Sequence, residues 1–287
     1  MSGRAAKVLP RRAVLAGGAA VVLGAAAPAA PFAALERRLE GGRLGVFARS
    51  GRATLAHRAD ERFPMCSTFK ALLAACVLAR VDAGEERLDR MIAYGPGDML
   101  SHAPVTEAHL KDGALSVEAL CKAIVEVSDN PAANLLLRTI GGPAGLTAWL
   151  RSIGDETTRL DRFELELNEA LPGDPRDTTT PRAMAADYGR LFDGKVLTQA
   201  SRRRLESWLV GATTGLQRLR KDTPAGWRVG DKTGNGARGS SNDVAVFWPP
   251  RGPRIYVAAY ITGTSVPMDV RNAVHAEVGR IVREGLS

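Results

Sequence analysis

The stretch from Ser67 to Asp82 reads STFKALLAACVLARVD and sets the centre of the fold. Its apolar residues recur at the spacing of a helix face, and positions 71–79 carry no charge, which predicts a helix buried on nearly all sides. Ser67 stands at the start of this helix and Lys70 follows one turn later, so both side chains are expected on one face. A lysine in an apolar setting can act as the base that activates a serine.

Strand-like segments lie on both sides of this helical centre. A β-hairpin is expected from residues 43–49 and 53–57, and three more strands are expected over 226–233, 242–248 and 254–262. Between the two sets, helices are expected over 117–127 and after Pro131, Thr180 and Thr198, and an amphipathic helix from Val270 ends the chain. We therefore expect an α/β plus all-α fold, in which a five-stranded antiparallel sheet built from both ends of the chain is covered by helices and an all-helical domain is inserted.

The first 29 residues differ in composition from the rest. Basic residues, among them Arg11 and Arg12, precede an apolar run and a small-residue site around Ala27, which are the parts of a secretory signal. The paired arginines also fit a twin-arginine signal, so the export route stays open. We expect residues 1–29 to be a signal peptide and the protein to be periplasmic or secreted. The remainder is expected to divide into a sheet domain (30–61 and 211–287) and a helical domain (62–210).

Composition excludes several classes of protein. The 287 residues are 45% hydrophobic and 24% charged, which suits a packed globular core. After residue 29 no apolar run reaches the ~20 residues that a membrane span needs. The formal charge of +8 falls to +4 without the four basic residues before Ala30, too little to favour nucleic-acid binding. The four histidines lack metal-ligand spacing, so neither a metal nor a cofactor is expected.

Three cysteines, Cys66, Cys76 and Cys121, form an odd set without a C-x-x-C pair, so at least one thiol is expected to be free.

Three short motifs occur in a fixed order along the chain. They are Ser67-Thr-Phe-Lys70, Ser128-Asp-Asn130 and Lys232-Thr-Gly234. Each one alone could arise by chance, and Ser128-Asp-Asn130 before a proline could be no more than a helix cap. Their combination is far less probable by chance. The stretch from Arg162 to Asp177, with no sustained periodicity, is expected to form an ordered Ω-type loop.

These motifs resemble those of the class A serine β-lactamases, within the penicillin-binding enzyme superfamily. The loop sequence RFELELN at 162–168 and the sequence DPRDTT at 174–179 are similar to the same family, and the resemblance covers essentially the whole mature chain. It implies an α/β sheet domain and a helical domain with the site between them. It also implies a monomeric enzyme that hydrolyses a small-molecule β-lactam, such as a penicillin or a cephalosporin.

The resemblance implies a role for each catalytic residue. Ser67 would attack the lactam carbonyl, Lys70 would take or relay the serine proton, and Ser128 would protonate the departing nitrogen. Glu164, helped by Asn168, would position and deprotonate the hydrolytic water. Whether Lys70 or Glu164 is the base in acylation stays open.

The resemblance also assigns the substrate-binding residues. Asn130 would hold the side-chain amide, and the backbone N–H groups of Ser67 and Asn235 would form the oxyanion hole. Lys232 and Thr233 would bind the carboxylate together with a second cation. Many family members take that cation from a strand arginine, where this chain has Ser241.

Arg218 is expected to supply the second cation instead, although it could also be one more solvated charge. Arg162 and Asp177 are expected to pair and close the Ω loop. The rival functions are a cell-wall DD-peptidase and a non-catalytic β-lactam-binding sensor domain, and Glu164 in its loop is the feature that argues against both.

Overall fold

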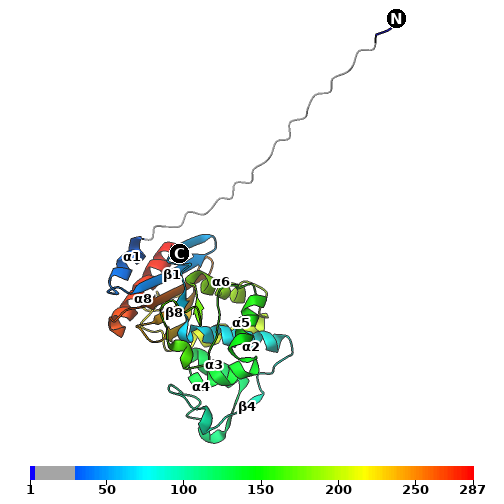
Figure 1. Cartoon of the computed structure of the whole chain (residues 1–287), viewed down its shortest axis with the longest axis vertical. Coiled ribbons are helices and arrows are strands. Elements are labelled where there is room, and N and C mark those ends of the chain that lie inside the picture. Colours follow the sequence, from blue (N-terminus) through cyan, green and yellow to red (C-terminus); the bar gives the residue numbers. More distant parts are fainter. Residues whose placement is uncertain (4–29) are drawn as a thin grey trace.

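The computed structural model describes residues 1–3 and 30–287, so residues 4–29 of the expected signal peptide lie outside the described residues. A five-stranded antiparallel sheet runs through the molecule with the strand order β2-β1-β9-β8-β7 (Figure 1). The strands are β1 (Arg43–Ser50), β2 (Ala53–His57), β7 (Arg228–Asn235), β8 (Ser241–Trp248) and β9 (Ile255–Thr262). The N-terminal hairpin joins the sheet through β1, which pairs with the last strand β9 from Arg43 opposite Thr262 to Ser50 opposite Ile255. The predicted fold is confirmed.

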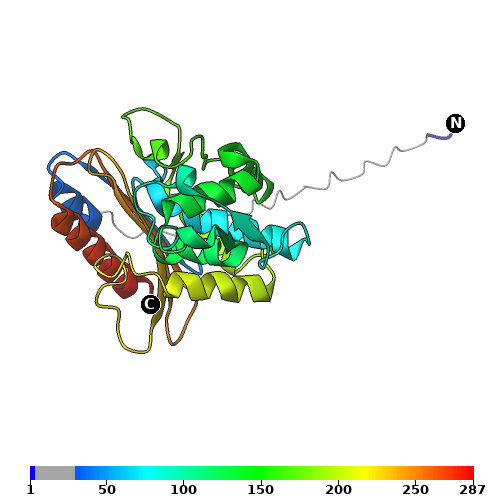
Figure 2. The ribbon, with the colours of Figure 1, turned by 90° about the horizontal axis from the view of Figure 1, so that it is seen from below.

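Two helices cover one face of this sheet. They are α1 (Ala30–Arg37) and α8 (Met268–Leu286), which lie side by side at the two ends of the chain (Figures 1 and 2). Apolar residues of both helices, such as Phe32 and Val278, join the strands in one buried cluster. Helix α8 was predicted from the sequence, whereas α1 was not.

The helical region covers the opposite face (Figure 2). Its helices are α2 (Phe69–Asp82), α3 (Val117–Glu126), α4 (Asn130–Thr139), α5 (Gly142–Ser152), α6 (Pro181–Phe192) and α7 (Gln199–Val210). Short strands tie its loops together in two pairs, β3 (Phe63–Pro64) with β6 (Thr178–Thr179) and β4 (Met91–Ala93) with β5 (Ala114–Ser116). No helix in the described part of the chain is long and apolar enough to cross a membrane.

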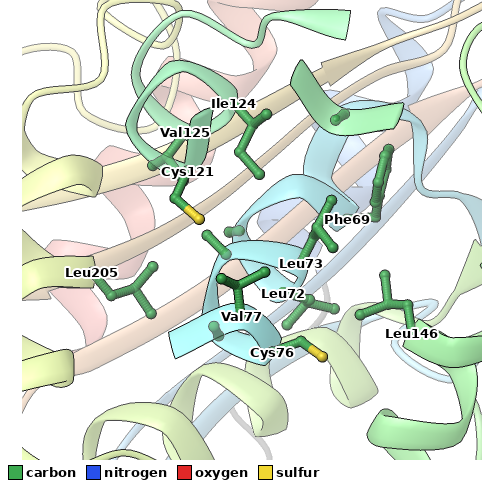
Figure 3. Close-up of a cluster of buried hydrophobic side chains, with 14 of the residues drawn as sticks. Phe69, Leu72, Leu73, Cys76, Val77, Cys121, Ile124, Val125, Leu146 and Leu205 are labelled. Carbon is green, nitrogen blue, oxygen red and sulfur yellow. The ribbon is translucent and has the colours of Figure 1, made fainter. Parts of the chain in front are cut away.

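Helix α2 lies at the centre of the helical region, as its sequence predicts. All its residues from Phe69 to Leu78 are buried. Figure 3 shows α2 surrounded by side chains from its neighbours, including Ile124 of α3, Leu146 of α5 and Leu205 of α7. Because every face of α2 contacts protein, its first turn is held rigidly, and the reactive groups on that turn have a fixed position.

Threonine and aspartate side chains set where several of these helices begin. Thr180 and Thr198 accept hydrogen bonds from the backbone of α6 and α7, and Asp129 does so at α4. These caps satisfy N–H groups that the first turn leaves without a partner. The starts of α6 and α7 therefore fall where the sequence predicts them.

Candidate active site

A cleft of about 250 Å³ opens between the helical region and the end of β7. It is lined by Ser67, His102, Ser128, Asn130, Asn168, Thr214, Thr233, Gly234 and Asn235. All three sequence motifs contribute to this lining. A larger cavity of about 480 Å³ lies under the loop of residues 162–178 and includes no residue of the three motifs.

Ser67 lies in a short 3₁₀ turn, Cys66–Thr68, that leads directly into α2. Cys66 has a φ of 46°, in the left-handed region that non-glycine residues rarely adopt and that concentrates at functional sites. Strand β7 approaches this turn closely, because a Cβ at Gly234 would lie 2.8 Å from Met65 O and 3.0 Å from Ser67 N. A side chain at position 234 would therefore push β7 away from the Ser67 backbone.

The ammonium group of Lys70 is completely buried and surrounded by oxygen atoms. Its Nζ donates to Ser128 O at 2.8 Å and to Asn130 Oδ1 at 2.5 Å, and it lies 3.0 Å from Glu164 Oε1. Burial lowers the pKa of Lys70, and the negative charge of Glu164 opposes part of that lowering. A lysine with a lowered pKa is suited to accept or relay a serine proton.

Glu164 brings the reactive groups together. Ser67 Oγ donates to its Oε1 at 3.3 Å, and Asn168 Nδ2 donates to its Oε2 at 2.6 Å. Asn134 fixes the backbone of Glu164, because its side chain accepts from Glu164 N at 3.0 Å and donates to Glu164 O at 2.9 Å. The nearby Glu166 is exposed, whereas Glu164 is buried and contacts Ser67 and Lys70.

The two ends of the loop that carries Glu164 meet at a buried carboxylate. Asp177 accepts hydrogen bonds from Asp161 N at 2.7 Å, Arg162 N at 3.0 Å and Arg162 Nε at 2.6 Å. Arg162 also contacts Glu169 within the loop at 2.5 Å. The loop is therefore closed by an ion pair reinforced by backbone hydrogen bonds.

Ser128 links the two buried lysines. Its φ of 63° is left-handed, and its Oγ accepts from Lys232 Nζ at 3.0 Å, while Lys70 Nζ lies 3.4 Å from the same oxygen. Burial, together with the nearby charge of Lys70, lowers the pKa of Lys232 to about 7. The capping role belongs to Asp129, whose Oδ1 accepts from Ala132 N at 3.0 Å. Ser128 itself remains available to the cleft.

Arg218 reaches the far end of the cleft. Its guanidinium donates to Asn235 Oδ1 at 2.6 Å, Asn242 O at 2.8 Å and Asn272 Oδ1 at 2.9 Å. The side chain is only 4% exposed, so the alternative of a solvated charge is wrong. Next to it, Thr233 Oγ1 lies 2.6 Å from Thr214 Oγ1.

The cysteines take no part in a disulfide. All three are free and buried. Within residues 1–3 and 30–287, no three His, Cys, Asp or Glu side chains come together as metal ligands would.

Comparisons with known proteins agree with this geometry. The family model described as the beta-lactamase enzyme family matches residues 31–286. A solved structure of an ancestral class A beta-lactamase is 59% identical, with a TM-score of 0.87, and the match covers 89% of this chain and 98% of that one. The chain belongs to the class A serine β-lactamases.

Other members are similarly close to this β-lactamase. Beta-lactamase AST-1 of Nocardia asteroides is 50% identical over 89% of this chain and 82% of its own length, and beta-lactamase FAR-1 of Nocardia farcinica is 49% identical over 88% and 81%. The structure of a putative class A beta-lactamase from Rhodopseudomonas palustris is 52% identical, with a TM-score of 0.86 over 90% of this chain and all of that one.

Two residues that contact the site of this β-lactamase were given no role from the sequence. Asn134 holds the backbone of Glu164, and Thr214 meets Thr233. The position of Asn134, one helical turn after Asn130, places both on one face of α4 and is a signal that could have identified it. Thr214 offered no such signal, because only the folded chain brings it to β7.

Proposed function

We propose that this β-lactamase hydrolyses the lactam amide of penicillins and cephalosporins through an acyl-enzyme on Ser67, which is then hydrolysed by water activated by Glu164. The observation that carries the proposal is the convergence of Ser67 Oγ, Lys70 Nζ and Asn168 Nδ2 on one buried carboxylate at the edge of the cleft. A nucleophile, a lysine of lowered pKa and a carboxylate in contact form a set able to make and break an ester.

In acylation, Ser67 Oγ attacks the lactam carbonyl and loses its proton to Lys70 or Glu164, both of which are within reach. The N–H groups of Ser67 and Asn235 stabilise the oxyanion, and each such donor is typically worth about 3 kcal/mol. The C–N bond then breaks, and Ser128 Oγ delivers a proton to the departing nitrogen. The proton taken from Ser67 passes through Lys70, whose Nζ lies 3.4 Å from Ser128 Oγ, and restores the Ser128 hydroxyl. Lys232, which donates to Ser128 Oγ, favours this transfer.

In deacylation, Glu164 takes a proton from a water molecule that attacks the acyl carbonyl. Asn168 orients both the carboxylate and the water. The ester bond to Ser67 breaks and Ser67 recovers its proton, which regenerates the enzyme. Glu164 is buried, and Asn134 is hydrogen-bonded to its backbone. Both features keep the carboxylate oriented toward Ser67.

Substrate binding uses the polar groups at both ends of the cleft. Asn130 binds the substrate's side-chain amide, while Lys232, Thr233 and Arg218 bind its carboxylate. A guanidinium suits this role because it presents two parallel donors to a carboxylate. In the free enzyme, Asn235 Oδ1 occupies one donor of Arg218.

The rival functions lack a deacylating base. A DD-peptidase or a β-lactam-binding sensor would be acylated without rapid turnover, whereas the contacts of Glu164 with Ser67 and Asn168 favour turnover here. We also propose that the protein is exported, on the basis of the signal-like residues 1–29. From the family resemblance we further propose that it acts as a monomer.

Nitrocefin turnover tests the proposal directly. The purified protein is expected to hydrolyse nitrocefin with multiple turnovers, and a Ser67→Ala variant is expected to be inactive with the same melting temperature. A single stoichiometric burst from the parent protein would instead favour the DD-peptidase or sensor alternatives.

A further inference from the structure

Two buried carboxyl groups stand on the strands that end at the cleft, and the mechanism above does not use them. Asp231 precedes Lys232 on β7, and Asp243 lies on β8 opposite Thr233. Asp231 is opposite Ala245, two residues further along β8, so the two carboxyl groups lie diagonally across the same face of the sheet. Both side chains are completely buried.

Both acids contact the turn formed by residues 215–220. Asp243 Oδ2 accepts a hydrogen bond from Leu219 N at 3.1 Å, and Arg220 Nε lies 2.9 Å from Asp231 Oδ1. Gly215, at the start of the turn, packs closely against the carboxylate of Asp231: a Cβ at this position would lie 1.7 Å from Asp231 Oδ2. Two points of the turn that carries Arg218 are thus held by carboxyl groups, and a third packs closely against one of them.

The pair has an unusual hydrogen-bonding state. Both carboxylate oxygens of Asp231 and Oδ1 of Asp243 are buried without a hydrogen-bond partner among the described residues, although Asp231 Oδ1 lies within ion-pair distance of Arg220. Burial raises the pKa of both groups, and the nearby Arg218, Arg220 and Lys232 oppose part of this for Asp231. Neighbouring buried carboxyl groups cannot readily both ionise, so the pair is expected to hold one proton.

We propose that Asp243 and Asp231 are positioning residues for the substrate carboxylate. They hold the turn of residues 215–220 so that the guanidinium of Arg218 lies against Asn235 at the end of the cleft. Neither acid lines the cleft, so both act through Arg218. The inference rests on the proposed function, in which Arg218 binds the carboxylate.

The test compares a penicillin with its methyl ester, which lacks the carboxylate charge. The ratio of kcat/KM for acid over ester is measured on one preparation, so it does not depend on how much of a variant is folded. Arg218→Ala is expected to lower this ratio about 10-fold or more, and Asp243→Ala about fivefold or more. Asp243→Asn keeps an oxygen acceptor for Leu219 N, and its ratio is expected to stay within about twofold of the parent's.

Asp155 provides the matched control. It is also a buried acid that accepts from backbone N–H groups, but these belong to Thr157 and Thr158, in a loop that does not carry Arg218. Asp155→Ala is expected to lower the melting temperature and leave the ratio unchanged, which separates positioning from general stability.

The outcomes distinguish two failures. An unchanged ratio in Arg218→Ala overturns the role of Arg218 in the proposed function. A lowered ratio in Arg218→Ala with an unchanged ratio in Asp243→Ala overturns only the positioning role. If Asp243→Ala does not fold, Gly215→Ala takes its place, because its methyl group would displace the turn from Asp231; an unchanged ratio there also overturns the inference.

Discussion

Replacing Asp177 with Asn removes a negative charge from the point where the two ends of the Ω loop meet. The asparagine keeps one oxygen that can accept from Asp161 N and Arg162 N. Its NH₂ group, however, cannot accept from Arg162 Nε, which lies 2.6 Å from Asp177 Oδ2. The variant therefore loses one charge-assisted hydrogen bond, typically about 1.5–3 kcal/mol.

The remaining contacts of Arg162 limit the cost. Its side chain is 16% exposed and keeps its contact with Glu169, so the loss stays below the ~3–5 kcal/mol of breaking a fully buried ion pair. We expect the free energy of unfolding of Asp177→Asn to fall by about 2 kcal/mol. At ~2–4 °C per kcal/mol, this lowers the melting temperature by about 4–8 °C.

The same change should alter catalysis, because the loop carries Glu164. The kcat/KM for small penicillins is expected to fall, and the kcat/KM for bulkier cephalosporins is expected to rise relative to it. The assays are calorimetric melting and kcat/KM for both substrate classes. Asp174→Asn, which breaks an Arg176 pair in the same loop, is the control and should melt close to the parent. An Asp177→Asn protein with the parent's melting temperature and substrate profile would refute the reasoning.

Three further predictions concern the buried lysine, the thiols and the carboxylate site. Because the pKa of Lys232 is lowered to about 7, its charge is lost as pH rises, so kcat/KM should fall above about pH 7; a constant kcat/KM up to pH 9 would contradict its role. Burial raises the pKa of Cys66 and Cys76 to about 12, so native protein should not react with a thiol reagent, and rapid native labelling would show that they are accessible. Adding Ser241→Arg to Arg218→Ala should restore part of the lost kcat/KM for penicillins, and no recovery would mean that a cation on β8 cannot reach the carboxylate.

Much of the fold was predictable from local patterns. The uncharged run of residues 71–79 predicts a helix buried on nearly all sides, and α2 is buried from Phe69 to Leu78. Thr180 and Thr198 mark helix starts because their side chains cap locally. Helix α1 was missed, since its few residues follow directly on the signal-like stretch and one of its packing partners, α8, lies more than 200 residues further along the chain.

The residues of the site were predictable only where a motif marks them. Ser67, Ser128 and Lys232 stand in recognisable short motifs, and the structure brings these three motifs to one cleft. Asp231 and Asp243 carry no such mark. Their contacts with residues 215–220 depend on strand register and on the path of a turn, which no local pattern contains.

The acyl-enzyme of a Glu164→Ala variant tests the central claim most directly. The variant is mixed with a penicillin, and its intact mass is followed with time beside that of Glu166→Ala, the exposed neighbour. We predict that Glu164→Ala gains the mass of one penicillin on Ser67 and keeps it, because acylation proceeds and deacylation lacks its base, while Glu166→Ala turns over as the parent does. A Glu164→Ala protein that carries no adduct, or releases it as fast as the parent, would contradict the account.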